Sequence, residues 1–174
     1  PGERIHVVGA GGAAAAAACL LAHHVGARVS GCDAGGPSQY TPPLQDVGIP
    51  LAWAHDPGHV ARDGALFADR LAVTKALTSV QPDHPELLAA RSRGIPATSV
   101  QQLIADAAAT RGGALIGVAG THGKSTTTGW LIHLLAVAGL DLAAYGGQRR
   151  ILVAEGGAAV GRQRLERSRR NRLE

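Results

Sequence analysis

The chain contains few aromatic and few charged side chains. Aromatic residues make up 3% and charged residues 17% of its 174 residues, whereas hydrophobic residues make up 45% and glycine occurs 24 times. Alanine supplies much of the apolar fraction, so the core must form from closely packed layers in which each contact buries little area. This composition is typical of a globular α/β protein.

Cysteine is scarce as well. Cys19 and Cys32 are too few for a disulfide framework and lack the spacing of a metal site. Each is expected to be a small core residue in a reducing compartment. No apolar run approaches the ~20 residues needed to span a bilayer, and the alanine run at 13–18 follows no basic segment, unlike a signal peptide. A cytoplasmic protein is the expectation.

The positive charge is concentrated near the end of the chain. The formal net charge is +4, but eight of the 17 basic residues and only three of the 13 acidic residues follow Gln148. Residues 149–174 have no apolar period and no aromatic side chains to stack on bases, although Ile151–Glu155 has the character of a strand. We expect a disordered basic tail and no nucleic-acid partner; an RNA-binding arm is the alternative.

The N-terminal part predicts a nucleotide-binding βαβ unit, with a strand, a glycine turn, an alanine-rich helix and a second strand over residues 5–30. The turn supplies three glycines that would let a diphosphate approach the backbone: Gly9, Gly11 and Gly12. Asp33 follows the second strand, where dinucleotide-binding proteins carry an acid that binds the ribose. Because Ala14 replaces the third glycine of the GxGxxG pattern, a purely structural turn is the alternative.

Strands and helices continue to alternate as far as residue 110, which implies a parallel sheet with crossover helices. The expected elements are strands at 49–53, 70–74 and 95–98 and helices at 85–93 and 100–110. Ser99 is expected to cap the last helix, with Gln102 in the capping-box position. An arginine and two glycines at 111–113 then predict a domain boundary.

His55 and His59 have the i, i+4 spacing of a metal-binding pair. The intervening Pro57 and Gly58 argue against a continuous helix there, and no third ligand is evident nearby. The sequence therefore does not predict a metal site at this position.

A second glycine turn, at residues 120–126, carries the most specific motif. An apolar strand leads into this turn and a helix that begins near Lys124 leads out of it. A helix N-terminus attracts phosphate, Lys124 can reach the outer phosphate oxygens, and the Ser125 hydroxyl can bind Mg²⁺. We interpret the turn as a nucleoside-triphosphate site. Val118 stands where the strict Walker pattern has its first glycine, so an ordinary strand-to-helix turn is the alternative.

The helix after this turn is predicted to run to about residue 138. Its apolar face is expected to be formed by Trp130, Leu131, Leu134, Leu135 and Ala138. His133 lies off this stripe and is expected to be a solvated surface residue.

Two nucleotide-type turns about 110 residues apart, on separate α/β units, resemble the Mur ligase family, which are ATP-dependent amino-acid ligases of peptidoglycan precursor synthesis. The resemblance spans residues 4–147 and is carried by residues 5–12, 29–33, 82–87 and, most specifically, 120–127. His122 favours the alanine-adding members of the family.

The resemblance implies a function for each part. Residues 1–110 would form a Rossmann-like domain that binds the UDP part of the substrate, with Gly9, Gly11 and Gly12 near the diphosphate and Asp33 near the uridine. Residues 111–148 would begin a P-loop ATPase domain. Its ATP-binding residues would be Gly120, Thr121, His122, Gly123, Lys124, Ser125 and Thr126. Lys124 and His122 would be catalytic and Ser125 would hold Mg²⁺, while UDP-N-acetylmuramate and L-alanine would be joined through an acyl phosphate.

The family's later acidic metal-binding segment, later histidine and third domain have no counterpart after Gly147. The chain is therefore expected to be an N-terminal piece of such a ligase, truncated and inactive by itself. The main alternative is an NAD(P)-binding module of an oxidoreductase, based on the first turn and Asp33. That alternative leaves residues 120–126 unexplained.

Overall fold

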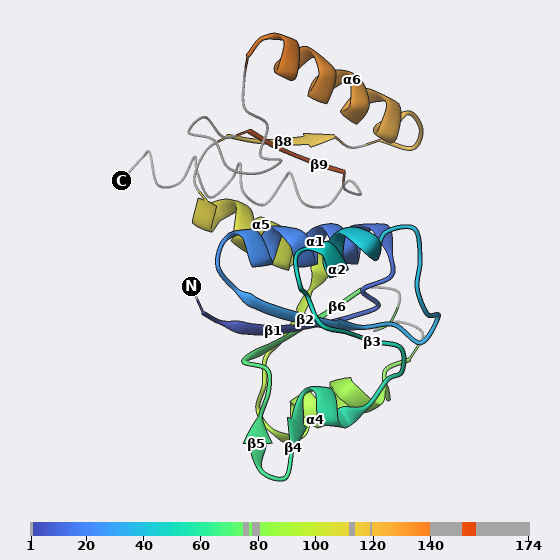
Figure 1. The fold of residues 1–174 in the computed structure, drawn as a ribbon, viewed down its shortest axis with the longest axis vertical. Coiled ribbons are helices and arrows are strands. Elements are labelled where there is room, and N and C mark those ends of the chain that lie inside the picture. The colour runs from blue at the N-terminus through green and yellow to red at the C-terminus, as the bar shows by residue number, and fades with distance from the viewer. Residues whose placement is uncertain are drawn as a thin grey trace. The chain divides into compact units, whose positions relative to one another are not determined.

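The computed structural model describes residues 2–74, 77, 81–111, 114–118, 120–139 and 151–155. The chain divides into two compact units, Pro1–Thr110 and Arg111–Glu174 (Figure 1). Within the described residues, no helix is both long enough and apolar enough to cross a membrane.

The first unit is built on a five-stranded parallel sheet with the strand order β3-β2-β1-β6-β7. Its strands are β1 (Arg4–Val8), β2 (Arg28–Cys32), β3 (Leu51–Ala52), β6 (Arg70–Val73) and β7 (Ala97–Ser99). Val8 pairs with Cys32 on one side and Val73 on the other, so the three central strands end at the same edge. A central first strand with crossover connections to both sides is characteristic of the Rossmann fold. The predicted α/β class with a Rossmann-like first domain is confirmed.

Helices cover both faces of this sheet (Figure 1). One face carries α1 (Ala13–His24), α2 (Pro42–Asp46) and α5 (Val100–Arg111). The other carries α4 (Pro85–Ser92), the 3₁₀ turn η1 (Pro57–His59) and the hairpin of β4 (Ala61–Arg62) and β5 (Ala65–Leu66). This hairpin was not predicted from the sequence; its turn residues Asp63 and Gly64 have the positive φ angles, 51° and 83°, of a type I′ turn.

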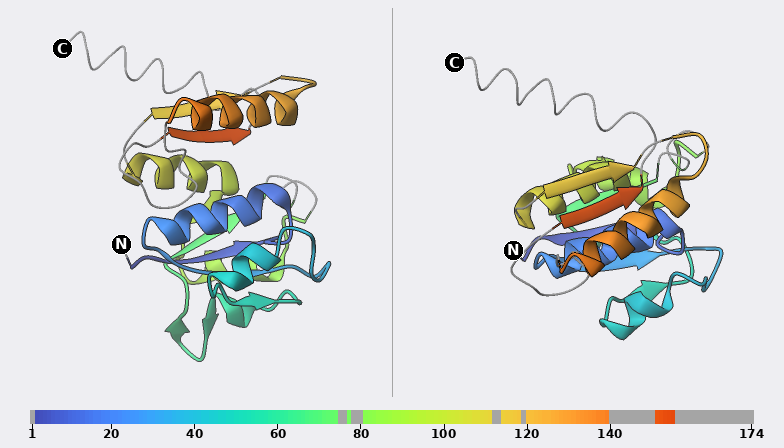
Figure 2. Two further views of the ribbon diagram at one scale, coloured as in Figure 1. Left: turned by 45° about the horizontal axis from the view of Figure 1, so that its top comes forward. Right: turned by 90° about the horizontal axis from the view of Figure 1, so that it is seen from above.

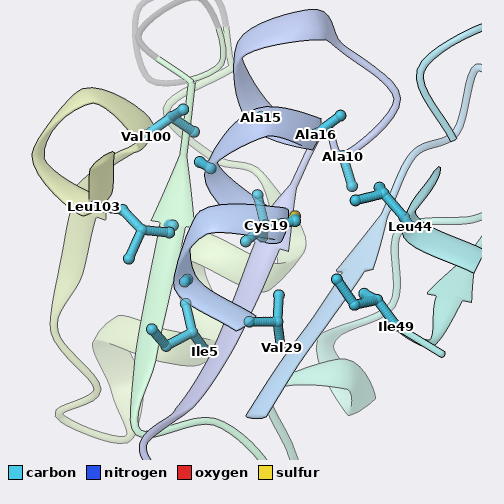
Figure 3. Close-up of a cluster of buried hydrophobic side chains, with 14 residues drawn as sticks. Ile5, Ala10, Ala15, Ala16, Cys19, Val29, Leu44, Ile49, Val100 and Leu103 are labelled. Carbon is cyan, nitrogen blue, oxygen red and sulfur yellow. The ribbon is translucent and has the colours of Figure 1, made fainter. Parts of the chain in front are cut away.

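The alternation of side chains along β1 separates two hydrophobic clusters. Ile5 and Val7 join the cluster under α1, whereas Val8 joins the cluster under α4. Small residues of α1 let the helix lie close to the sheet, and Cys19 lies fully buried among them (Figure 3). Burial raises the pKa of the Cys19 thiol to about 12, so this cysteine is an inert core residue, as expected.

The start of α5 confirms one half of the expected capping box. The Gln102 backbone N–H donates to Ser99 Oγ at 3.0 Å. The Gln102 side chain donates instead to Asp106 Oδ1 at 2.7 Å, one turn further along the same helix. The reciprocal bond back to Ser99 is therefore replaced by an i, i+4 pair.

The second unit contains β8 (Ala114–Val118), α6 (Lys124–Val137) and β9 (Ile151–Glu155). β8 and β9 run side by side in parallel, with Ile116 opposite Val153, and α6 packs on them (Figure 2). The strand character of residues 151–155 is thus confirmed, and the expectation of disorder is wrong for them. The other residues of the predicted basic tail lie outside the described residues.

The predicted apolar face of α6 is only partly buried. Leu131 and Leu135 are half-buried, whereas Trp130 is 62% and Leu134 57% exposed. Among the described elements of this unit, β8 and β9 both contact the helix. His133 is exposed, as predicted.

Two adjacent leucines of α4 test the packing on its face of the sheet. Leu87 is 2% exposed within the buried cluster, whereas Leu88 is 45% exposed. Leu87→Ala is expected to lower the free energy of unfolding by about 2–5 kcal/mol, because it leaves a cavity in the core. Leu88→Ala is the matched control, with an expected cost under about 1 kcal/mol. Urea unfolding followed by circular dichroism measures both, and equal costs would contradict the assigned burial.

Candidate functional site

The turn between β1 and α1 is held against the end of β2. The backbone N–H groups of Gly9 and Ala10 both donate to the Cys32 carbonyl oxygen, at 2.8 and 3.0 Å. Gly9 has a φ of +78°, which disfavours any side chain there. A Cβ on Gly31 would lie 2.6 Å from Ala10 Cβ, so β2 needs a glycine where the turn crosses it. The turn is therefore fixed by close backbone contact.

This turn leaves the start of α1 open to an anion. The N-cap residue Gly12 is exposed and makes no side-chain capping bond, so the first N–H groups of the helix lack an intrahelical partner. Ala14 is also exposed, and its methyl group therefore does not obstruct the packing that the third glycine of the pattern permits elsewhere.

Asp33 lies beside the glycine turn and is bonded to it. Its Oδ2 accepts a hydrogen bond from the Gly11 N–H at 2.9 Å, and its Oδ1 accepts one from the Gly35 N–H at 2.8 Å. Ser38 Oγ donates to the Gly11 carbonyl at 2.7 Å and ties the following loop to the same place. Ser38 was not predicted as a site residue, because a serine in a glycine- and proline-rich loop has no periodic signal in the sequence.

The structure thus brings the four predicted UDP-binding residues together at the carboxyl edge of the sheet: Gly9, Gly11, Gly12 and Asp33. In open α/β sheets, ligands bind outside this edge. The N–H groups of Gly9, Gly11 and Gly12 already have acceptors, so the donors that remain for an anion are those at the start of α1. The acid that was expected to face a ribose or uridine braces the loop through two backbone bonds.

The second predicted turn connects β8 to α6. Its N-cap residue Gly123 has a left-handed φ of 75° and makes no side-chain capping bond. Lys124 Nζ donates to the Gly120 carbonyl at 2.9 Å, so the ammonium group lies over the turn. His122 is exposed, with its Nδ1 3.3 Å from Thr121 Oγ1.

All seven predicted ATP-binding residues lie in this turn or in the first turn of α6. Thr126 is exposed, and Ser125 is the second residue of the helix; the side chain of Ser125 lies outside the described part of the structure. Open helix N–H groups, one ammonium group and no acidic residue between 120 and 126 make a local environment that suits a phosphate.

A further polar cluster, which the sequence did not predict, lies on the α4 face of the first unit. Glu86 is fully buried there, with His59 Nδ1 at 2.5 Å and His6 Nε2 at 3.5 Å from its Oε1. The Cys32 thiol donates to the two carboxylate oxygens at 3.2 and 3.1 Å. His55 Nδ1 lies 3.6 Å from Oε2 and 3.3 Å from Cys32 Sγ. One carboxylate therefore joins β1, β2, η1 and α4.

The titration of these groups is shifted by their contacts. Burial by itself would raise the pKa of the Glu86 carboxyl, but the contacts with His6, His59 and Cys32 outweigh burial and lower that pKa to about 2. Burial, reinforced by the Glu86 charge, raises the pKa of the Cys32 thiol above its ordinary value. Burial and the nearby His55 lower the pKa of His84, against the opposing effect of Glu86. The metal-free cluster thus holds a carboxylate, a neutral thiol and a neutral His84.

The parallel sheet with a glycine turn at its carboxyl edge, followed by a strand–turn–helix that suits a phosphate, defines an α/β protein with a Rossmann-like first unit. A family model described as "Mur ligase family, catalytic domain" matches residues 4–111, and the chain belongs to this family. The resemblance that the sequence motifs carry is confirmed.

Curated relatives of similar sequence are UDP-N-acetylmuramate–L-alanine ligases. The protein from Methylibium petroleiphilum is 38% identical over 139 residues, which cover 80% of this chain and 27% of that protein. The protein from Kineococcus radiotolerans is 41% identical over 138 residues, covering 79% of this chain and 28% of that protein. The chain thus spans just over a quarter of the length of these relatives.

Solved structures give the same assignment. The UDP-N-acetylmuramate-alanine ligase MurC from Thermotoga maritima superposes with a TM-score of 0.70 at 25% identity, over 88% of this chain and 37% of that chain. A murein peptide ligase from Psychrobacter arcticus superposes with a TM-score of 0.68 at 29% identity, over 80% and 28% of the two chains.

The buried Glu86 carboxylate should make the free energy of unfolding depend on pH. The folded pKa of Glu86 is below its ordinary value of 4.5, so the unfolded chain binds more protons as the pH falls from about 5 to about 2. The stabilisation is present above this window and is lost through it; the lowered pKa of His84 acts in the same direction at higher pH. Glu86→Gln should flatten the pH dependence in this window and cost on the order of 3 kcal/mol at pH 7.

Thermal unfolding measured at several pH values in a chelating buffer tests this expectation. Asp83→Asn is the matched control, because Asp83 is an exposed acid three residues earlier in the chain and should leave the pH profile unchanged. A Glu86→Gln profile parallel to that of the wild type would show that the carboxylate is not the titrating group.

Proposed function

We propose that the chain is the nucleotide-binding part of an ATP-dependent ligase that joins L-alanine to UDP-N-acetylmuramate in peptidoglycan precursor synthesis, in the cytoplasm. The observation that carries this proposal is the 120–126 turn, in which Lys124 lies over an open helix N-terminus. Family membership and the names of the relatives support the choice of substrates. No nucleic-acid partner is part of the proposal.

In this proposal, the first unit binds the UDP part of the substrate. The diphosphate is held by the glycine turn and the open N–H groups of α1, whose N-cap Gly12 makes no competing side-chain bond. The Asp33 carboxylate keeps Gly11 and Gly35 in place through two backbone bonds. Asp33 therefore positions the turn. The family resemblance further implies that Asp33 lies near the uridine.

The second unit binds the triphosphate of ATP. The ammonium group of Lys124 exchanges its bond with the Gly120 carbonyl for phosphate oxygens, and helix N–H groups supply further donors. Cationic groups offset the charge that builds on the transferred phosphoryl group when the acyl phosphate forms. His122 is exposed at the mouth of the turn, where it can contact the nucleotide. Mg²⁺, which would be held by Ser125, supplies further charge neutralisation.

An NAD(P)-binding oxidoreductase module is the weaker candidate. It accounts for the glycine turn and Asp33, but it leaves no role for a second phosphate-type turn, and the family match favours a ligase.

Removing the Lys124 ammonium group should abolish stabilisation by ATP. In the wild-type chain, ATP at a hundred times its Kd should add about 2.7 kcal/mol to the stability of the second unit and raise its Tm. Lys124→Ala should show no such shift, because the ammonium group that meets the phosphate charge is gone. His133→Ala, on an exposed position of the same helix, is the control. Differential scanning fluorimetry with ATP and Mg²⁺ measures the shift, and full protection of Lys124→Ala would refute a phosphate role for this lysine.

The first turn should prefer UDP to NAD⁺. A Cβ on Gly11 would lie 2.6 Å from Asp33 Oδ2, so Gly11→Ala should displace the carboxylate and weaken UDP binding about tenfold or more. Gly94→Ala is a useful comparison, since a Cβ on this glycine between α4 and β7 would meet nothing within 4 Å, although its φ of +67° will cost some stability. Isothermal titration with UDP and with NAD⁺ decides between the two candidates. Tighter binding of NAD⁺ would favour the oxidoreductase.

A further inference from the structure

The polar cluster around Glu86 contains ligand types that bind transition metals. Four groups provide one atom each, and these atoms all lie within 4.8 Å of one another: His6, Cys32, His59 and Glu86. A thiolate, two imidazoles and a carboxylate are the ligands that Zn²⁺ takes in proteins. The cluster shares no residue with either predicted nucleotide turn.

The separations of the ligand atoms suit a tetrahedral ion. Bonds of about 2.0–2.3 Å at tetrahedral angles place ligand atoms roughly 3.3–3.8 Å apart. His6 Nε2 and Cys32 Sγ lie 3.5 and 3.2 Å from Glu86 Oε1, so the sulfur would move outward slightly to reach this range. The direct contact of 2.5 Å between His59 Nδ1 and the same oxygen must open further. His59 can move because it lies at the partly exposed end of η1.

In the part of the chain that the structure describes, three buried ring nitrogens around Glu86 lack a hydrogen-bond partner, namely His6 Nε2 and both nitrogens of His84, and His6 Nε2 is the one within the four-residue set. His6 Nε2 is buried and makes no hydrogen bond, although it lies near the Glu86 carboxylate. The other ring nitrogen, Nδ1, lies 2.9 Å from Ser30 Oγ on the adjacent strand. A metal-binding histidine is characteristically oriented in this way, with one nitrogen free for the ion and the other held by a neighbouring group.

The geometry points to a zinc site in the first unit, formed by His6 Nε2, Cys32 Sγ, His59 Nδ1 and the Glu86 carboxylate. Four protein ligands close the coordination sphere, so the ion is structural. It binds two negative groups, the thiolate and the carboxylate, and the thiol proton is released to solvent. Metal affinity therefore rises with pH.

The site would act on the fold around the first glycine turn. Its ligands come from β1, β2, η1 and α4, and the backbone oxygen of Cys32 accepts the bonds from Gly9 and Ala10. Zinc would therefore fasten η1 and α4 to the strands that hold the turn. His55 and His84 stay beside the ion as neighbouring groups; with Glu86 they form a second triad of possible ligands, and the experiment separates the two sets.

Cobalt provides a direct spectroscopic test on the 174-residue chain. After removal of metal with a chelator, Co²⁺ alone is titrated in. We expect one equivalent to bind with the visible bands of a tetrahedral ion and a near-ultraviolet thiolate-to-cobalt charge-transfer band, and Zn²⁺ should displace it. The affinity should increase with pH, and Zn²⁺ should raise the Tm by several degrees.

Two pairs of variants assign the ligands. Cys32→Ser should lose the charge-transfer band, whereas Cys19→Ser, which alters the other buried thiol on the opposite face, should keep it. His59→Ala should weaken Co²⁺ binding at least tenfold, whereas His23→Ala, on an exposed position of α1, should not. Circular dichroism establishes that each variant is folded.

The wild-type chain alone can overturn the proposal, whatever the variants do. Absence of Co²⁺ binding at micromolar concentration would exclude the site. Binding without a thiolate band would exclude Cys32 and place the ion on the His55, His84 and Glu86 triad, which contradicts the four-residue assignment. Persistence of the band in Cys32→Ser, or unchanged affinity in His59→Ala, would also contradict it.

Discussion

The carbonyl oxygen of Cys32 holds together the part of the molecule on which the first site depends. It accepts the N–H groups of Gly9 and Ala10, so the turn after β1 is bonded to the end of β2. This contact requires a glycine at 31, because a Cβ there would strike Ala10. These two hydrogen bonds fix the position of the start of α1 relative to β2. The loop braced by Asp33 and the Cys32 side chain on the other face both follow from the same end of β2.

Both glycine turns present the N-terminus of a helix to a ligand, but different charged groups surround them. Each places an uncapped helix N-terminus after a parallel strand. The first turn adds no cation and is braced by the Asp33 carboxylate, which suits a ligand that is held but does not react. The second adds the Lys124 ammonium group, which can follow charge as it develops on a phosphoryl group. This difference fits the proposed function, in which the first turn binds the UDP part of a substrate and the second binds the ATP that reacts.

Local patterns in the sequence predict most of the fold and both turns. The strands, the main helices and the Ser99 cap are each encoded within a few consecutive residues, and the structure contains them. The Glu86 cluster could not be found in this way. His6 and Cys32 lie on paired strands, and Glu86 comes from a helix more than fifty residues later, so only the sheet register and the crossover bring them together. The sequence around His55 and His59 therefore could not show which distant groups the fold brings beside these two residues.

Different interactions stabilise the two faces of the first sheet. Under α1, small apolar side chains let the layers approach, and burial of area accounts for their stability. Under α4, a carboxylate is removed from water, which is costly unless charge and hydrogen bonds compensate. Glu86 lies in the first turn of α4, where the helix dipole favours a negative charge, and imidazole and thiol groups surround it. Replacing one of these partners would leave the Glu86 charge less compensated. Shortening an apolar side chain under α1 would change only the apolar area that is buried. The α4 face is consequently the one whose stability responds to protons and, in our proposal, to zinc. It is connected to the first glycine turn through Cys32, whose thiol donates to Glu86 and whose carbonyl oxygen accepts the N–H groups of Gly9 and Ala10.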